Sequence, residues 1–221
     1  MKRLVIFDLD GTLLNTIEDL GRAANYALEV NGYPTHSVAS YPFFVGNGVR
    51  KLIERVLPED INKELVIDKM LADFKAYYNE HNTDYTAPYP GITDMLEWLQ
   101  EEGVKIAVAS NKYDLATQKL IRHYFPDVAF AAIEGQKEGI PVKPDPSIVF
   151  SILAQVKVRK SDALYVGDSG VDMETARRAC IDSVGVTWGF RPEKELVEYH
   201  AGHIVSTPVE IEKIVEQYIE Q

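Results

Sequence analysis

Short runs of consecutive apolar residues alternate with stretches of helical periodicity along most of this chain, and no other feature constrains its fold as strongly. The runs include Leu4–Phe7, residues 105–109 and residues 163–166. An unbroken apolar run of this length is typical of a strand that is buried on both faces. Strands of this kind that alternate with helices build a parallel sheet, so the sequence predicts an α/β fold with a doubly wound, Rossmann-like sheet.

The expected elements of this fold follow one another from residue 4 to residue 219. Gly103 marks the end of one helix, as glycine often does just past a helix C-terminus. The strands are expected at residues 4–7, 105–109, 128–133, 163–166 and 182–186, and the helices at residues 92–102, 115–124, 148–156, 172–180 and 210–219.

Residues 16–85 interrupt this alternation. Their apolar residues recur at helical spacing, and the stretch shows no clear strand pattern. The segment Pro-Tyr-Pro-Gly at residues 88–91 then marks a turn before strands and helices alternate again. We therefore expect a core formed by residues 1–15 and 86–221, with residues 16–85 inserted into it as a helical domain.

Composition excludes two classes of partner. The chain has 23 Lys and Arg residues against 34 Asp and Glu residues, and the resulting net charge of −11 repels the phosphate backbone of nucleic acids. No apolar stretch approaches the length that crosses a bilayer, so we expect no membrane partner.

The single cysteine, Cys180, excludes an intramolecular disulfide and favours the cytoplasm. We expect its side chain to be buried near a helix end. Whether the chain is a monomer or a homodimer stays open.

Polar clusters follow three of the expected strands, at residues 8–12, 110–112 and 167–172. Ligands of doubly wound sheets bind at the carboxyl ends of the strands, so these clusters should meet in one crevice. The proline-flanked loop that contains Lys143 should reach the same place. The sequence therefore predicts one site built from segments that are far apart in the chain.

Three carboxylates are expected in this crevice. Asp8 and Asp10 lie two residues apart and so face the same side of an extended chain, and Asp168 joins them from another strand. Carboxylates that lie close together raise one another's pKa, and a hard divalent cation such as Mg²⁺ relieves their repulsion. With Lys143 as a further positive charge, the site suits phosphoryl transfer in which one carboxylate attacks and a second moves a proton.

Four motifs carry a resemblance to a known family. Through them the chain resembles the haloacid dehalogenase-type phosphohydrolase superfamily over nearly its whole length. In chain order they are Asp8-x-Asp10-Gly11-Thr12, Ser110, Lys143 within Lys-Pro-Asp-Pro, and Gly167-Asp168-x-x-x-Asp172.

The resemblance implies roles for the carboxylates. Asp8 would be the nucleophile and form an aspartyl-phosphate, and Asp10 would be the general acid and base. A Mg²⁺ ion would be held by Asp8, the backbone carbonyl of Asp10 and Asp168, with Asp172 as a further carboxylate at the metal. Dehalogenase members lack an aspartate at the position of Asp10, so the resemblance favours a phosphatase or a phosphomutase.

The same resemblance implies which groups hold the substrate. Ser110, Asn111 and Lys143 would bind the transferring phosphoryl group, and Thr12 of the first motif would lie at the substrate. The inserted helices resemble the small α-helical cap of the family.

Two segments resemble phosphoglycolate phosphatases more narrowly: residues 44–48 (Phe-Val-Gly-Asn-Gly) and residues 186–190 (Val-Thr-Trp-Gly-Phe). We expect Gly46, Asn47 and Gly48 to form a tight turn that faces the substrate. Arg50, which follows this turn, is a candidate for bidentate pairing with a substrate carboxylate.

The sequence thus predicts a Mg²⁺-dependent phosphatase of small phosphorylated metabolites, with phosphoglycolate as the most favoured single substrate. An inorganic pyrophosphatase and a sugar phosphomutase of the same fold remain alternatives, because the core motifs describe the phosphoryl group and not the leaving group. Other interpretations fit less well. A calcium loop would need glycine where Leu13 stands, a dinucleotide fingerprint would need glycine where Lys51 stands, and a receiver domain would carry no helical insertion after the acidic pair.

Overall fold

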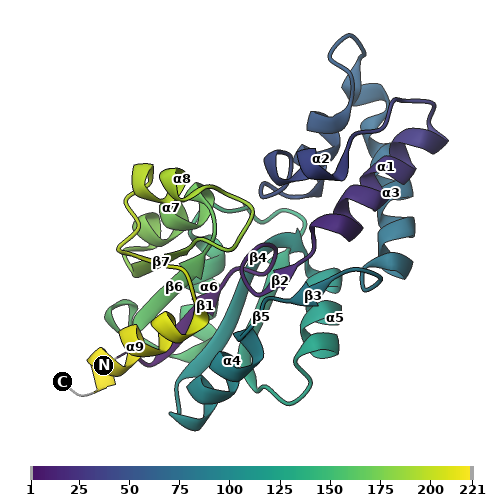
Figure 1. Ribbon diagram of the computed structural model, residues 1–221. Helices are drawn as coiled ribbons and strands as arrows, with labels where there is room; N and C mark the ends of the chain where they lie inside the picture. Colours follow the sequence, from purple (N-terminus) through teal and green to yellow (C-terminus); the bar gives the residue numbers. More distant parts are fainter. Residues whose placement is uncertain (1, 220–221) are drawn as a thin grey trace.

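All strands of the main sheet run parallel, and this sheet forms the larger part of the protein (Figure 1). The structure is a computed structural model that describes residues 2–219. The strand order is β5-β4-β1-β6-β7-β8, so β1 lies in the interior of the sheet between two later strands. The bounds are β1 (Leu4–Phe7), β4 (Lys105–Tyr113), β5 (Phe130–Gln136), β6 (Ala163–Gly167), β7 (Asp182–Val186) and β8 (His203–Val205).

Helices cover both faces of the sheet because successive residues of each strand point to opposite sides. Val5 and Phe7 pack with α4, α5 and α9 on one face, whereas Leu4 and Ile6 pack with α6 and α7 on the other. The predicted doubly wound α/β fold is therefore confirmed. The bounds of these helices are α4 (Ile92–Glu101), α5 (Asp114–Tyr124), α6 (Ser147–Val156), α7 (Gly170–Ala179) and α9 (Pro208–Ile219), with a 3-10 turn at η3 (Lys160–Asp162).

Some core elements differ from the ranges that the sequence predicts. The predicted strand ends at residue 109, but β4 continues to Tyr113 with irregular pairing to β5 after Ala109. The polar residues 110–112 therefore belong to the end of the strand itself. The six residues of α8 (Glu193–Glu198) and the three residues of β8 are not predicted, because segments this short show no clear period.

Cys180 is exposed, which corrects the expectation that it is buried. It lies just past the end of α7 with φ 57°, in the left-handed conformation that terminates many helices. The chain returns to the core only at the next residue, Ile181, which packs beneath the sheet. The helix therefore ends within one residue of the predicted position, but the side chain that enters the core is that of Ile181.

The helices between β2 and β3 pack around a hydrophobic cluster of their own, which includes Leu28, Ile53, Met70 and Phe74. Figure 1 shows this helical subdomain beyond the carboxyl ends of the strands of the sheet. Within residues 2–219, no helix is long and apolar enough to cross a membrane. The bounds are β2 (Leu14–Asn15), α1 (Ile17–Val30), η1 (Val38–Phe43), α2 (Val49–Val56), η2 (Lys63–Leu65), α3 (Ile67–His81) and β3 (Ala87–Pro88).

One buried carboxylate joins the two connections between the subdomain and the sheet. β2 and β3 pair as antiparallel neighbours, and beside them Asp19 of α1 accepts hydrogen bonds from the chain that returns to the core. Its donors are the backbone N–H groups of Tyr85 and Thr86 and the hydroxyl of Thr86, at 2.7–3.1 Å. Since Asp19 is only 2% exposed, these donors have little access to water as a substitute.

The substitution Asp19→Ala should lower the free energy of unfolding by about 2–4 kcal/mol, because it leaves the buried donors of Tyr85 and Thr86 without an acceptor. Urea denaturation followed by circular dichroism measures this loss. The matched control is Glu18→Ala, which removes a neighbouring carboxylate from a surface pair with Arg22 and should cost less than about 0.5 kcal/mol. Equal stability of the two variants would contradict the role given to Asp19.

Candidate active site

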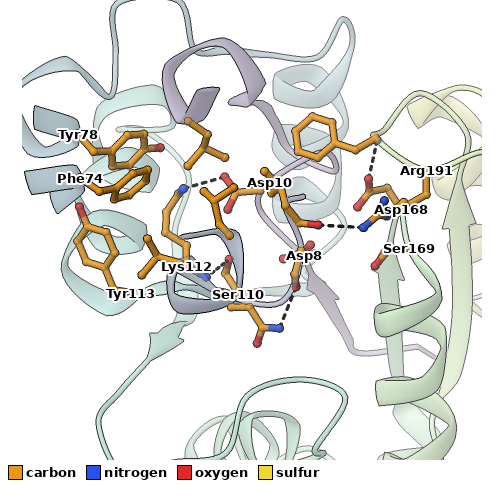
Figure 2. Close-up of a pocket in the computed structure, with 18 residues that line it drawn as sticks. Asp8, Asp10, Phe74, Tyr78, Ser110, Lys112, Tyr113, Asp168, Ser169 and Arg191 are labelled. Carbon is orange, nitrogen blue, oxygen red and sulfur yellow. Dashed lines mark hydrogen bonds and ion pairs between the residues drawn. The ribbon is translucent and has the colours of Figure 1, made fainter. Parts of the chain in front are cut away.

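A cavity of about 50 Å³ lies between the carboxyl ends of the strands and the helical subdomain (Figure 2). The core contributes Asp8, Asp10, Asp168 and residues 110–112 to its walls. The subdomain contributes residues of α1, α2 and α3 and the loop that precedes α2. The structure thus brings the three polar clusters of the sequence together at one place.

The ammonium group of Lys143 lies between two carboxylates at the floor of this site. Its Nζ is 2.9 Å from Oδ1 of Asp8 and 2.7 Å from Oδ1 of Asp172, and it also donates to the hydroxyl of Tyr165 at 3.0 Å. The Lys143 side chain is only 2% exposed. A buried ammonium is stable only with charged or hydrogen-bonding partners, and here every partner comes from a different segment.

Asn111 holds the loop that carries Lys143. Its Oδ1 accepts the backbone N–H of Lys143 at 2.8 Å, and its Nδ2 donates to the backbone carbonyl of the same residue at 3.1 Å. The same Nδ2 donates to the carbonyl of Gly46 in the subdomain at 3.0 Å. In this structure the amide of Asn111, a predicted phosphoryl-binding group, therefore fixes two backbone segments of the site.

Burial raises the pKa values of two of the carboxylates. The pKa of Asp8 rises from 3.8 to about 7, because loss of solvent outweighs the favourable charge of Lys143, and Asp172 and Asp10 raise it further. Burial also raises the pKa of Asp168 well above its ordinary value, with added repulsion from Asp172 and Asp8. Burial alone would lower the pKa of Lys143, but Asp172 and Asp8 raise it well above 10.5.

These carboxylates fit a hard divalent cation. Asp8, Asp168 and Asp172 each offer an oxygen, and the three oxygens lie within 4.8 Å of one another. Three carboxylates beside one ammonium leave an excess of negative charge in a buried place, and oxygen ligands of this kind suit Mg²⁺. Both oxygens of Asp172 are already engaged, one with Lys143 and one with the hydroxyl of Ser169 at 2.6 Å, so Asp172 has less freedom than the other two to bind an ion directly.

Asp10 faces a different group of residues from those three carboxylates. Its Oδ1 accepts the hydroxyl proton of Thr16 at 2.6 Å and lies 3.0 Å from Nζ of Lys112. The Lys112 ammonium also lies 4.7 Å from the ring centre of Tyr78, which belongs to α3 of the subdomain. The sequence places Lys112 in a polar cluster but assigns it no role, because neither contact is local in the chain.

Gly11 and Thr12 lie against Asp168 and do not line the cavity. Gly11 has φ 86°, and a Cβ atom at this position would lie 2.4 Å from Oδ2 of Asp168. Only glycine satisfies both conditions. Thr12 is fully buried, and its hydroxyl donates to Oδ1 of Asp168 at 3.5 Å. The structure therefore places this predicted substrate-binding residue against a candidate metal ligand.

Ser110 reaches the cavity, and its Oγ accepts the backbone N–H of Lys112 at 3.2 Å. Its hydroxyl proton is not used in that bond and is available to an oxygen of a ligand. Gly46 and Gly48 also line the cavity, both with positive φ, as a tight turn requires. The structure therefore places both glycines at the cavity, and a substrate-facing role for this segment stays a prediction.

Asn47 and Arg50 do not line the cavity. The Oδ1 of Asn47 accepts a hydrogen bond from Arg55 at 2.7 Å. The Arg50 guanidinium is half exposed and pairs with Asp68 at 3.1 Å and Glu54 at 3.6 Å, in a separate hollow lined by subdomain residues. The arginine that does line the cavity is Arg191, from the loop after β7, and the sequence assigns it no role.

The raised pKa values make a prediction about stability without metal. Between pH 4 and pH 7 the folded protein keeps a proton on Asp8 that the unfolded chain has lost, so the free energy of unfolding should fall as pH rises through this range. Urea denaturation in the presence of a chelator measures the fall. The variant Asp8→Asn removes this titration, so its stability relative to the parent should rise by about 2–4 kcal/mol between pH 4.5 and pH 7.5.

Added Mg²⁺ should stabilise the parent more at pH 7.5 than at pH 5, because protons compete for the same carboxylate oxygens. A stability difference between the parent and Asp8→Asn that does not change with pH would contradict the raised pKa of Asp8.

Residues 5–186 match the family model described as haloacid dehalogenase-like hydrolase. A phosphoglycolate phosphatase from Pseudomonas putida is 34% identical over 199 residues, which cover 86% of this chain and 71% of that protein. A phosphoglycolate phosphatase from Aquifex aeolicus is 30% identical over 223 residues, which cover 98% of each chain.

Two crystal structures are similar over nearly the whole chain. One is a Lactobacillus delbrueckii subsp. bulgaricus protein that carries the provisional name phosphoglycolate phosphatase; its TM-score is 0.90 at 34% identity, with 97% of this chain and 99% of that one covered. The other is a predicted phosphoglycolate phosphatase from Haemophilus somnus. Its TM-score is 0.87 at 27% identity, with 97% of this chain and 98% of that chain covered. Because coverage is so complete, the similarity includes the helical subdomain as well as the sheet.

Proposed function

This chain belongs to the haloacid dehalogenase-like hydrolase family, and from that premise we propose that it is a Mg²⁺-dependent phosphatase of small phosphomonoesters with phosphoglycolate as its preferred substrate. The observation that carries the proposal is the buried cluster of Asp8, Lys143 and Asp172 beside Asp168. Relatives named phosphoglycolate phosphatase that are at least 30% identical support the choice of substrate.

In the proposed reaction a carboxylate oxygen of Asp8 attacks the phosphorus atom of the ester. The bond from phosphorus to the leaving oxygen breaks, and Asp10 gives that oxygen a proton. The phosphoryl group is then an aspartyl-phosphate on Asp8. Asp10 next takes a proton from a water molecule that attacks phosphorus, which releases phosphate and restores the Asp8 carboxylate.

The remaining groups of the site hold the phosphoryl group in line with Asp8. We assign a Mg²⁺ site to Asp8, Asp168 and the backbone carbonyl of Asp10; the bound ion would neutralise charge on the phosphoryl oxygens. Lys143 adds its ammonium charge at the same oxygens, and the free hydroxyl proton of Ser110 donates to one of them. The position of Lys143 in turn depends on Asn111.

We assign residues 16–85 the role of a cap over a core formed by residues 1–15 and 86–221. Two observations support this assignment: the helices have their own hydrophobic cluster, and their loop before α2 is one wall of the cavity. A cap that opens admits the ester, and a cap that closes keeps bulk water away from the aspartyl-phosphate.

The test is phosphate release in the presence of Mg²⁺ from phosphoglycolate, pyrophosphate and hexose phosphates. We expect kcat/KM for phosphoglycolate to exceed the others by at least about tenfold, a difference of about 1.4 kcal/mol in transition-state binding. Fast release from pyrophosphate with none from phosphoglycolate would identify a pyrophosphatase. Isomerised hexose phosphate without free phosphate would identify a mutase.

The control for this panel is Asp8→Asn, which should lower kcat about 1,000-fold or more for every substrate, because the amide cannot attack phosphorus. The matched variant Asp68→Asn changes an exposed carboxylate of the subdomain and should keep the parent's rate. Parent-like turnover by Asp8→Asn would contradict the mechanism, whatever the substrate.

A further inference from the structure

Two cationic side chains, Lys112 and Arg191, line the cavity, and a third, Lys143, contacts the lining carboxylate Asp8. Both lysines already pair closely with carboxylates. Nζ of Lys143 lies 2.9 Å from Asp8, and Nζ of Lys112 lies 3.0 Å from Asp10. The remaining cation is Arg191. Within residues 2–219 its one carboxylate neighbour is Glu195, at 3.8 Å from Nε, which is beyond hydrogen-bond distance.

Arg191 is held in place but keeps most of its donors. Its side chain is 16% exposed, and its Nη2 donates to the backbone carbonyl of Val45 at 2.9 Å. A guanidinium has five N–H donors, and this is the one hydrogen bond that the described residues give it. Arg191 lines the same cavity as Asp8 and Asp168, and Figure 2 draws it on the Asp168 side of the view.

The surroundings of Arg191 favour an added anion. The other oxygen of Glu195 already accepts the backbone N–H of Gly170 at 2.8 Å. Arg55, on the subdomain, has its pKa lowered by burial and by the charge of Arg191, so the two guanidinium groups repel each other near the loop that Arg191 contacts. Arg55 has no carboxylate within 4 Å among the described residues, and it donates to the carbonyl of Phe44 and to Asn47 instead.

The cavity also contains an unused polar group on its other side. The hydroxyl of Tyr78 is fully buried, lines the cavity and has no hydrogen-bond partner among the residues that the structure describes. A cavity with free polar groups suits a polar ligand. Its volume of about 50 Å³ is small, since each water needs roughly 10–15 Å³, so in this conformation it admits a ligand the size of a few waters.

We propose that Arg191 determines the substrate specificity of this enzyme by binding a carboxylate of the substrate. The inference rests on the proposed function and names the residue that selects its substrate. The phosphoryl group of the substrate would lie at Asp8 and Lys143, and its carboxylate at the free N–H donors of Arg191. A guanidinium binds a carboxylate through two parallel hydrogen bonds. A phosphate ester that has no carboxylate cannot form this pair.

The role belongs to Arg191 and not to Arg50. The charge of Arg50 is already balanced by two carboxylates within 4 Å, and Arg50 lies outside the cavity. Arg191 also contacts the subdomain through Val45, so the carboxylate would be bound where core and subdomain meet.

The test compares phosphoglycolate with ethyl phosphate, which has the same chain length but no carboxylate. Arg191→Gln should raise KM for phosphoglycolate about 30-fold or more, while kcat/KM for ethyl phosphate changes less than about threefold, because only the first substrate loses a charge-assisted pair. Arg191→Lys keeps the positive charge but cannot form two parallel hydrogen bonds to one carboxylate, so it should give an intermediate KM. The matched control is Lys194→Gln, an exposed cation on α8, which should leave both substrates unaffected.

The outcomes separate this inference from the proposed function. If the parent hydrolyses phosphoglycolate and Arg191→Gln does so with an unchanged KM, the inference is wrong and the proposed function stands. Equal losses for both substrates would also overturn it, since Arg191 would then act only by holding the Val45 loop. If the parent prefers ethyl phosphate to phosphoglycolate, the proposed substrate fails and the inference fails with it. Melting curves of each variant show whether the fold is retained.

Discussion

The buried ammonium of Lys143 is the group on which the rest of the site depends. It lies within 3 Å of Asp8 and Asp172, at the carboxyl end of a strand with no exposed side chain. Each of these charges would be costly alone in such a place, so each is stable only while the others are present. With Asp168 the cluster has three carboxylates for one ammonium, and this excess of negative charge suits a divalent cation.

The same cluster is connected to the helical subdomain through backbone carbonyls. Asn111 holds Lys143 and donates to the carbonyl of Gly46, and Arg191 donates to the carbonyl of the preceding residue, Val45. Two core side chains thus bind successive residues of one loop. Both hydrogen bonds therefore connect core residues of the site to the loop that forms one wall of the cavity.

The sequence predicts the fold and the floor of the site because both depend on local order: β1 is a continuous apolar run, and Asp8 follows it directly. The wall of the cavity depends on packing between distant segments. Lys112 stands in a recognisable polar cluster at the end of β4, but its contact Tyr78 comes from α3 of the subdomain. Arg50 follows the glycine turn in sequence, yet the rotation of α2 turns it toward Glu54 and Asp68, and the cavity receives an arginine more than a hundred residues away. Neither the hydrophobic periodicity nor the spacing of motifs in the sequence indicates which of the two arginines lines the cavity.

The proposed mechanism requires that Asp8 of this buried cluster attacks phosphorus. The most direct measurement is mass spectrometry of the Asp10→Asn variant, quenched in acid during reaction with phosphoglycolate and Mg²⁺, since loss of the proton carrier slows breakdown of the intermediate. We expect the peptide containing Asp8 to gain the mass of one phosphoryl group and fragmentation to locate that group on Asp8. Phosphate release without any label on that peptide, or a label on another residue, would contradict the account.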